Sequence, residues 1–189
     1  MKVFINPGHA PNGRPDPGAV NDFFKIRECD VAWDIGRQVK LYLIQAGCDV
    51  KILQSDNLNG EAPGENVVQT ANDWGADAFV SIHCNAFDGS ARGAETLVHD
   101  MVGGGSKLGQ CIQPQLVEAL QQVDKDFPDR GLKSRPLLTV LHATAMPAAL
   151  VECAFIDNGR DALILMQRKK EIAGAIARGV TDYWQRISS

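Results

Sequence analysis

Short apolar runs and longer amphipathic stretches follow one another along the chain. A short apolar run bounded by turn residues predicts a buried strand, and apolar residues that recur every three or four positions predict a helix with one buried face. Pro114 should kink or split its helix, because proline lacks the backbone N–H. We expect strands over 3–5, 50–53, 78–82, 94–98 and 148–151, helices over 31–46, 67–74, 108–123 and 172–187, and a proline- and glycine-rich loop over 7–27.

Strands that alternate with helices are typical of an α/β domain with a largely parallel sheet. The 189 residues fit one domain, and no linker or repeat divides them. The sequence therefore predicts a single three-layer domain over residues 1–189. We expect a mostly parallel central sheet of about six strands, with helices on both faces.

The formal net charge of −4 argues against nucleic acid as a partner, because phosphate binding needs a basic face. No apolar run approaches the roughly 20 residues of a membrane span, so no membrane is expected. The first residues are broken too early by Pro7 and Gly8 for a signal peptide. This predicts either synthesis in the cytoplasm and release by another route, or a mature or truncated form.

Five cysteines form an odd set without a C-x-x-C pair, so neither disulfides nor a cysteine metal site is indicated. We expect mostly buried free thiols, in keeping with a reducing compartment. Cys84 and Cys153 stand beside the candidate residues His83 and Glu152, which raises a cysteine-nucleophile hypothesis. Neighbouring residues of a strand point to opposite faces, which argues against that hypothesis.

Three reactive residues stand where predicted strands end: His9, His83 and Glu152. Ligands of open α/β sheets bind beyond the carboxyl ends of the strands. A hydrolytic zinc site commonly takes two imidazoles and one carboxylate, and Glu28, at the start of the first helix, offers the carboxylate. Each residue also has a plain alternative: Glu28 as a first-turn acid, His9 as a loop histidine, His83 as a strand end, and Glu152 as a capping or ion-pairing acid after a buried strand. His99 and His142 are taken as non-ligands.

Several motifs extend this picture because they occur in a fixed order along nearly the whole chain. These motifs are Ile5–His9, Asp16–Ala19, Arg27–Glu28, Ala76–Ala86, Gly93–Thr96, Asp129–Lys133 and Met146–Asn158. Together they resemble the Amidase_3 family of zinc-dependent N-acetylmuramoyl-L-alanine amidases. The sequence differs from the usual family pattern at Ala10-Pro11, Gln54-Ser55-Asp56 and Cys153-Ala154.

The resemblance implies one catalytic Zn²⁺ bound by His9, Glu28 and His83, with Glu152 as the catalytic acid. The implied reaction is hydrolysis of the amide between N-acetylmuramic acid and L-alanine of peptidoglycan, by a monomer acting on the wall as an autolysin or phage endolysin. Asn85 and Arg130 are candidate substrate-binding residues, Arg130 because its planar guanidinium suits a carboxylate. A turn role for Asn85 and a plain surface position for Arg130 stay open.

Two other functions share these residues. A zinc carboxypeptidase-like enzyme would use two histidines, one glutamate ligand and a catalytic glutamate, but needs a positive pocket for a terminal carboxylate. A wall-binding module that has lost activity would keep the fold, although it has no reason to retain the ligands and the base.

Overall fold

A computed structural model describes residues 1–60 and 65–188, and its centre is a six-stranded sheet in the order β4-β1-β5-β8-β6-β7. Neighbouring strands are parallel except β6 and β8, which are antiparallel. The predicted α/β class and mostly parallel sheet are confirmed. The strands are β1 (Lys2–Pro7), β4 (Asp49–Ile52), β5 (Ala78–Asn85), β6 (Ala94–Val98), β7 (Asp129–Ser134) and β8 (Ala148–Phe155).

The helices differ from the sequence expectation in two ways. Two of them, α4 and α5, were not predicted, and α3 continues through Pro114 as one helix, so the expected split is wrong. The loop predicted over 7–27 contains a short 3-10 turn, η1 (Pro11–Gly13), and a small hairpin of β2 (Val20–Asn21) and β3 (Ile26–Arg27). The helices are α1 (Glu28–Gln45), α2 (Val67–Trp74), α3 (Gly104–Gln121), α4 (Thr139–His142), α5 (Gly159–Gln167) and α6 (Lys169–Ser188).

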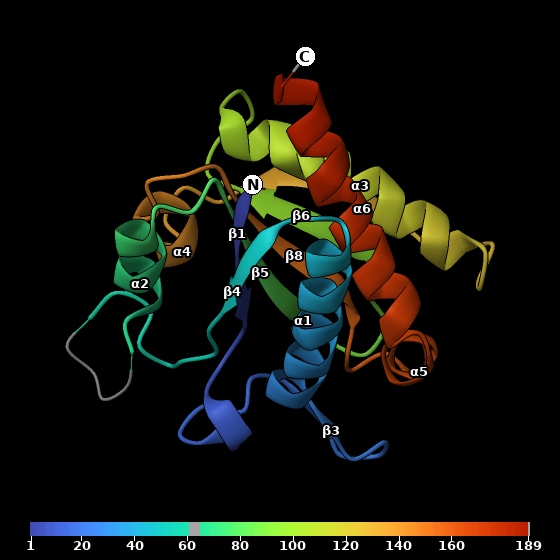
Figure 1. Cartoon of the computed structure of the whole chain (residues 1–189). Coiled ribbons are helices and arrows are strands. Elements are labelled where there is room, and N and C mark those ends of the chain that lie inside the picture. The colour runs from blue at the N-terminus through green and yellow to red at the C-terminus, as the bar shows by residue number, and fades with distance from the viewer. Residues whose placement is uncertain (61–64, 189) are drawn as a thin grey trace.

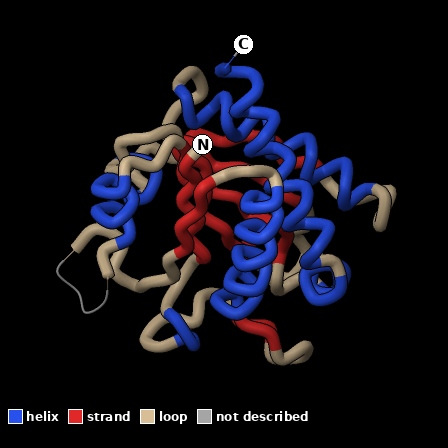
Figure 2. Tube along the Cα trace, viewed as in Figure 1, coloured by secondary structure: helices blue, strands red, loops and turns tan. Residues whose placement is uncertain are grey.

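Helices cover both faces of the sheet, which gives the predicted three layers (Figures 1 and 2). The long helices α1, α3 and α6 pack on one face, and α2 and α4 lie on the other. Side chains alternate between the two faces along a strand. Val80 and Ile82 accordingly join the core under the long helices, whereas Phe79 joins the smaller core under α2 and α4.

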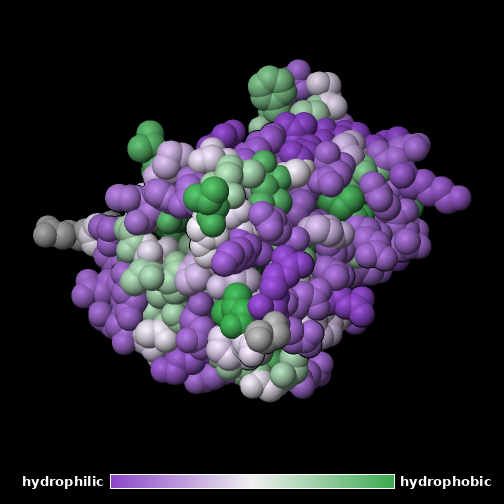
Figure 3. Space-filling model, turned by 90° about the horizontal axis from the view of Figure 1, so that it is seen from above, coloured by the Kyte–Doolittle hydropathy of each residue, from purple (hydrophilic) through white to green (hydrophobic). Residues whose placement is uncertain are grey.

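The alternation also places the polar residues of the sheet. Phe79, Ser81 and His83 share the face of β5 that α2 and α4 cover, and His83 comes last, toward the carboxyl end of the strand. The carboxyl ends of the parallel strands point to the bottom of Figure 1. Figure 3 shows the molecule from above, the side away from these carboxyl ends. The surface there is largely hydrophilic, with apolar side chains in small separate groups. None of the helices formed by residues 1–60 and 65–188 has the length and apolar character needed to cross a bilayer.

Candidate metal and catalytic site

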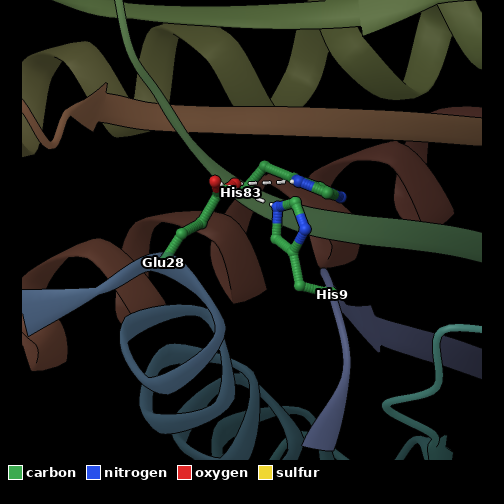
Figure 4. Close-up of side chains that lie close together, drawn as sticks. All are labelled: His9, Glu28 and His83. Atoms are coloured by element: carbon green, nitrogen blue, oxygen red, sulfur yellow. Dashed lines mark hydrogen bonds and ion pairs between the residues drawn. The ribbon is translucent and has the colours of Figure 1, made fainter. Parts of the chain in front are cut away.

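His9, Glu28 and His83 meet at the carboxyl ends of β1 and β5, although they are far apart in sequence (Figure 4). His9 follows β1, Glu28 is the first residue of α1, and His83 lies in β5. One ligand atom from each residue lies within 4.8 Å of those of the other two. This group of two imidazoles and one carboxylate has the donor set of a hydrolytic zinc site.

The ring of His9 is held by its backbone and by Asp16. Its φ of 67° lies in the left-handed region, which side-chain-bearing residues rarely adopt and which marks functional sites. Nδ1 lies 2.6 Å from Asp16 Oδ2, whereas the buried Nε2 faces the carboxylate of Glu28, whose Oε2 is 3.0 Å away. A carboxylate on one ring nitrogen that leaves the other nitrogen for a cation is the usual support of a metal-binding histidine.

Glu28 is a buried carboxylate fixed from several sides. Oε2 accepts the backbone N–H of Ala19 at 3.0 Å and lies 3.0 Å from His9 Nε2. Oε1 accepts the N–H of Cys84 at 2.9 Å and lies 3.0 Å from His83 Nδ1. Burial alone would raise the pKa of Glu28, but the hydrogen bonds and positive charge of His83 and His9 hold it well below its usual range.

His9 shows the matching effect. Burial alone would lower the pKa of its ring, but the hydrogen bonds and negative charges of Glu28 and Asp16 raise it to about 9. The site therefore stabilises a positive charge between two ionised carboxylates. A protonated ring would provide that charge, and so would a metal cation.

Two glycines lie so close to this group that a side chain at either position would displace its rings. A Cβ on Gly8 would lie 2.3 Å from His83 Cε1, and a Cβ on Gly18 would lie 2.6 Å from His9 Nε2. Gly18 also has a φ of +67°, which favours glycine. The buried Nε2 of His9 beside the carboxylate of Glu28, the donor set and this close backbone approach all fit a small bound cation.

Glu152 lies beside this group, since it is the register partner of His83 on the neighbouring strand β8. Its Oε2 is buried and has no hydrogen-bond partner among the described residues. Burial raises its pKa to about 7, an effect that the charge of His83 opposes and that Glu28 and Glu95 reinforce. A carboxyl poised near neutral pH is suited to move a proton. His83 and Glu152 lie within their strands, not after them as the sequence suggested, because β5 and β8 run further than their apolar cores.

The two candidate substrate-binding residues, Asn85 and Arg130, meet at Glu95. Asn85 Nδ2 donates to Glu95 Oε1 at 3.1 Å, and Arg130 Nε donates to Glu95 Oε2 at 2.7 Å. Sequence reasoning gave Glu95 no role in the site. It did not assign Asp16 to the site; the only signal was the position of Asp16 in a matched motif.

A cleft of about 170 Å³ opens from the metal-ligand group toward α4 and the segment before α2. Its lining is largely apolar beyond the two histidines. The lining residues are Asn6, His9, Asp16, Ser55, Asp56, Leu58, His83, Leu138, Thr139, Val140 and Leu150.

The remaining candidates lie elsewhere. His99 and His142 line a separate cleft with the first turn of α3. His99 follows β6, which runs antiparallel to β8, so it lies at the end of the sheet away from the metal-ligand group. Cys84 and Cys153 are buried in the core under the long helices, on the other face from His83 and Glu152. All five cysteines are free and four are buried, as the sequence predicted.

Comparison with known proteins agrees with this geometry. The sequence pattern of the Amidase_3 family, described as N-acetylmuramoyl-L-alanine amidase, matches residues 3–182. The chain belongs to the Amidase_3 family. This confirms the resemblance drawn from the motifs.

Relatives in the family cover nearly the whole chain. It is 33% identical over 180 residues to the sporulation-specific N-acetylmuramoyl-L-alanine amidase of Bacillus subtilis, and 32% identical over 185 residues to an endolysin of Bacillus phage SPP1. These alignments cover 95% of this chain but only 65% of either relative, so the chain spans about two thirds of their length.

A solved structure of the same family has the same fold. N-acetylmuramoyl-L-alanine amidase AmiC2 of Nostoc punctiforme superposes with a TM-score of 0.82 at 30% identity, and the match covers 98% of both chains.

Proposed function

We propose that this Amidase_3 chain is a zinc-dependent N-acetylmuramoyl-L-alanine amidase, which hydrolyses the amide between N-acetylmuramic acid and L-alanine in peptidoglycan. One observation carries the proposal: the His9–Glu28–His83 group adjoins Glu152, the register partner of His83, whose Oε2 is buried. Family membership indicates the same activity.

His9, Glu28 and His83 are the proposed zinc ligands. When bound, Zn²⁺ lowers the pKa of water to about 7 and polarises a carbonyl group. Asp16 would keep the ring of His9 oriented through Nδ1, and the two backbone N–H groups on Glu28 would keep its carboxylate in place. These supports reduce the reorganisation needed when a metal binds.

Glu152 is the proposed proton carrier. Its Oε2, which has no other hydrogen-bond partner in the described chain, would accept a proton from the attacking water. As the C–N bond breaks, the same oxygen would return that proton to the nitrogen of L-alanine. The products are a muramic acid carboxylate and a peptide with a free amino end. Such acid–base work is typically worth about 10²- to 10⁴-fold in rate.

Asn85 and Arg130 are proposed to contact the substrate next to this centre. Both are joined to Glu95, which is the register partner of Glu152 across β6 and β8. This neighbourhood supports a binding role better than a plain turn or surface role.

The remaining proposals concern how the chain acts. We propose that residues 1–189 form one catalytic domain that works as a monomer on the cell wall. On the face shown in Figure 3 the apolar side chains form only small groups, whereas stable interfaces usually need a broader apolar patch. Light scattering on the purified protein tests the oligomeric state.

The deciding experiment is digestion of purified cell wall, with and without a chelator. We expect chelator-sensitive release of soluble material, new L-alanine amino ends and no new reducing sugars, with activity restored by added zinc. New reducing ends would indicate a glycosidase and overturn the proposal. Cleavage of free peptides but not of intact wall would favour the carboxypeptidase-like alternative, and zinc binding without any release would favour a wall-binding module.

A further inference from the structure

A cluster of opposite charges lies beside Glu152, outside the proposed metal ligands. Glu95, only 5% exposed, accepts hydrogen bonds from Arg130 Nε and Lys133 Nζ on one carboxylate oxygen, and from Asn85 on the other. We call Glu95, Arg130 and Lys133 the cation cluster.

The cation cluster belongs to the reaction face of the sheet. His83, Glu152 and Glu95 are successive register partners on β5, β8 and β6, so their side chains form a row on one face. Cross-strand neighbours have Cβ atoms about 5 Å apart. The next strand, β7, carries Arg130 and Lys133, which extend the row away from the metal ligands.

The charges of the cluster do not cancel. Two cations share one buried carboxylate, which leaves one positive charge in excess. The side chains of Arg130 and Lys133 are 34% and 31% exposed, so both remain accessible. Arg130 uses only Nε toward Glu95, and its two terminal nitrogens have no hydrogen-bond partner within residues 1–60 and 65–188. Its guanidinium lies over the ring of Phe155 at 4.9 Å, which fixes the plane of the free donors.

We propose that the cation cluster binds the substrate through a carboxylate on the residue that follows L-alanine in the stem peptide. Arg130 and Lys133 contact that carboxylate, and Glu95 is a positioning residue that holds both cations. This inference rests on the proposed amidase function, because it takes the bond cleaved at Glu152 as its origin.

The chemistry of the substrate indicates the direction in which its peptide runs across the sheet. In the proposed reaction the carboxyl group of muramic acid is the acyl half of the cleaved amide, so it carries no charge. Negative groups near the cleaved bond therefore lie on the peptide side. The peptide would run over β6 and β7, and the sugar side would face the apolar cleft near Leu58 and Val140.

The distances select one carboxylate of the peptide. An extended residue spans about 3.3 Å, and the Cβ atoms of cross-strand partners such as Glu95 and Glu152 lie about 5 Å apart. The residue after L-alanine reaches this distance, whereas carboxylates at the far end of a stem peptide lie roughly 10 Å further on. A paired arginine and lysine discriminate a carboxylate from a carboxamide, since only the carboxylate makes charge-assisted hydrogen bonds to both.

Two matched substrates test the proposal: muramyl-L-alanyl peptides that carry either a free carboxylate or a carboxamide on the residue after L-alanine. For the zinc-loaded protein we expect kcat/KM at least about tenfold higher on the carboxylate. Arg130→Gln and Lys133→Gln should each lose about tenfold or more on that substrate and little on the carboxamide. Arg37→Gln, which removes an equal charge from an exposed position of α1, is the control.

Glu95→Gln tests positioning, assayed at a pH where Glu152 is ionised. We expect KM for the carboxylate substrate to rise, so that the ratio of kcat/KM between the carboxylate and carboxamide substrates falls. Equal kcat/KM on both substrates, or equal losses on both in Arg130→Gln, would overturn the proposal.

A binding measurement separates this inference from the proposed function. The free dipeptides, with carboxylate or carboxamide, are titrated into the zinc-loaded protein by calorimetry. Tighter binding of the carboxylate form that disappears in Arg130→Gln supports the cation cluster even if neither muramyl substrate is cleaved. Equal binding of the two dipeptides overturns the cluster even if the wall is cleaved.

Discussion

Glu95 and Glu152 are register partners across the antiparallel strands β6 and β8, so two carboxylates lie side by side on one face of the sheet. Glu95 is surrounded by two cations, whereas Glu152 is buried with one oxygen unpartnered among the described residues. Burial is the main reason that the pKa of Glu152 rises to about 7, and the negative charge of Glu95 adds to it.

Glu95→Gln should therefore shift the pH dependence of hydrolysis. Without the negative charge of Glu95, the pKa of Glu152 falls. Glu152 must be ionised to accept a proton, so activity is lost as the pH falls through this pKa, and the loss should occur at lower pH in the variant. A bound cation lowers the pKa in both proteins, so the difference between them is the quantity to measure. The check is kcat against pH on the carboxamide substrate, with Glu118→Gln on the exposed side of α3 as control. An acid limb that stays in place or moves to higher pH would contradict the electrostatic coupling.

Glu152→Gln should separate metal binding from turnover. The amide has nearly the same volume as the carboxyl but cannot accept and return the proton, so we expect wall hydrolysis to fall by about 10²- to 10⁴-fold. His9, Glu28 and His83 are unchanged, so zinc content measured by mass spectrometry should stay at one ion per chain. An active variant with full zinc would remove Glu152 from the mechanism. His9→Ala and His83→Ala should show the converse, with a lower zinc content.

The sequence predicted the central strands because they are buried on both faces and therefore read as continuous apolar runs. It did not predict β7, an edge strand whose partly exposed sequence, Asp129–Ser134, has no such run. The two-residue strands β2 and β3 are too short for any periodicity. The α/β class and the edge strand β4 could be derived from the pattern, whereas the edge strand β7 could not.

The candidate site could likewise be predicted only in part from the sequence. Strand ends, the start of the first helix and residue types indicated His9, His83, Glu152 and Glu28, and the family resemblance implied their individual roles. The contact of Asp16 with His9, and the row from His83 through Glu152 to Glu95, depend on strand order and register. Neither can be read from the spacing in sequence, because β6 is antiparallel to β8 and the partners are up to 69 residues apart along the chain.

Gly8→Ala should weaken zinc binding without touching a ligand. The added Cβ would lie 2.3 Å from His83 Cε1, so the imidazole must move. We expect zinc affinity to fall by about 10- to 100-fold, the range seen when the support of a ligand is disturbed. The control is Gly159→Ala, because a Cβ there meets nothing within 4 Å. Competition with a fluorescent chelator measures both affinities, and equal values for the two variants would argue against the tight fit of Gly8 on His83.

Zinc binding should release a proton from His9 at neutral pH. The carboxylates of Glu28 and Asp16 outweigh burial and raise the pKa of His9 to about 9, so below that pH the ring is mostly protonated in the metal-free protein. A metal ligand must be a neutral imidazole, so the proton competes with zinc. The apparent affinity should rise about tenfold per pH unit between pH 7 and about 9, and then level off.

Calorimetry in two buffers of different ionisation enthalpy counts the protons released. Asp16→Asn removes one of the two carboxylates that raise this pKa, so it should reduce the proton release at pH 8, whereas Asp126→Asn at an exposed position should not. Zinc binding that releases no proton at pH 7, or an affinity that does not change with pH, would show that His9 is neutral before the metal arrives.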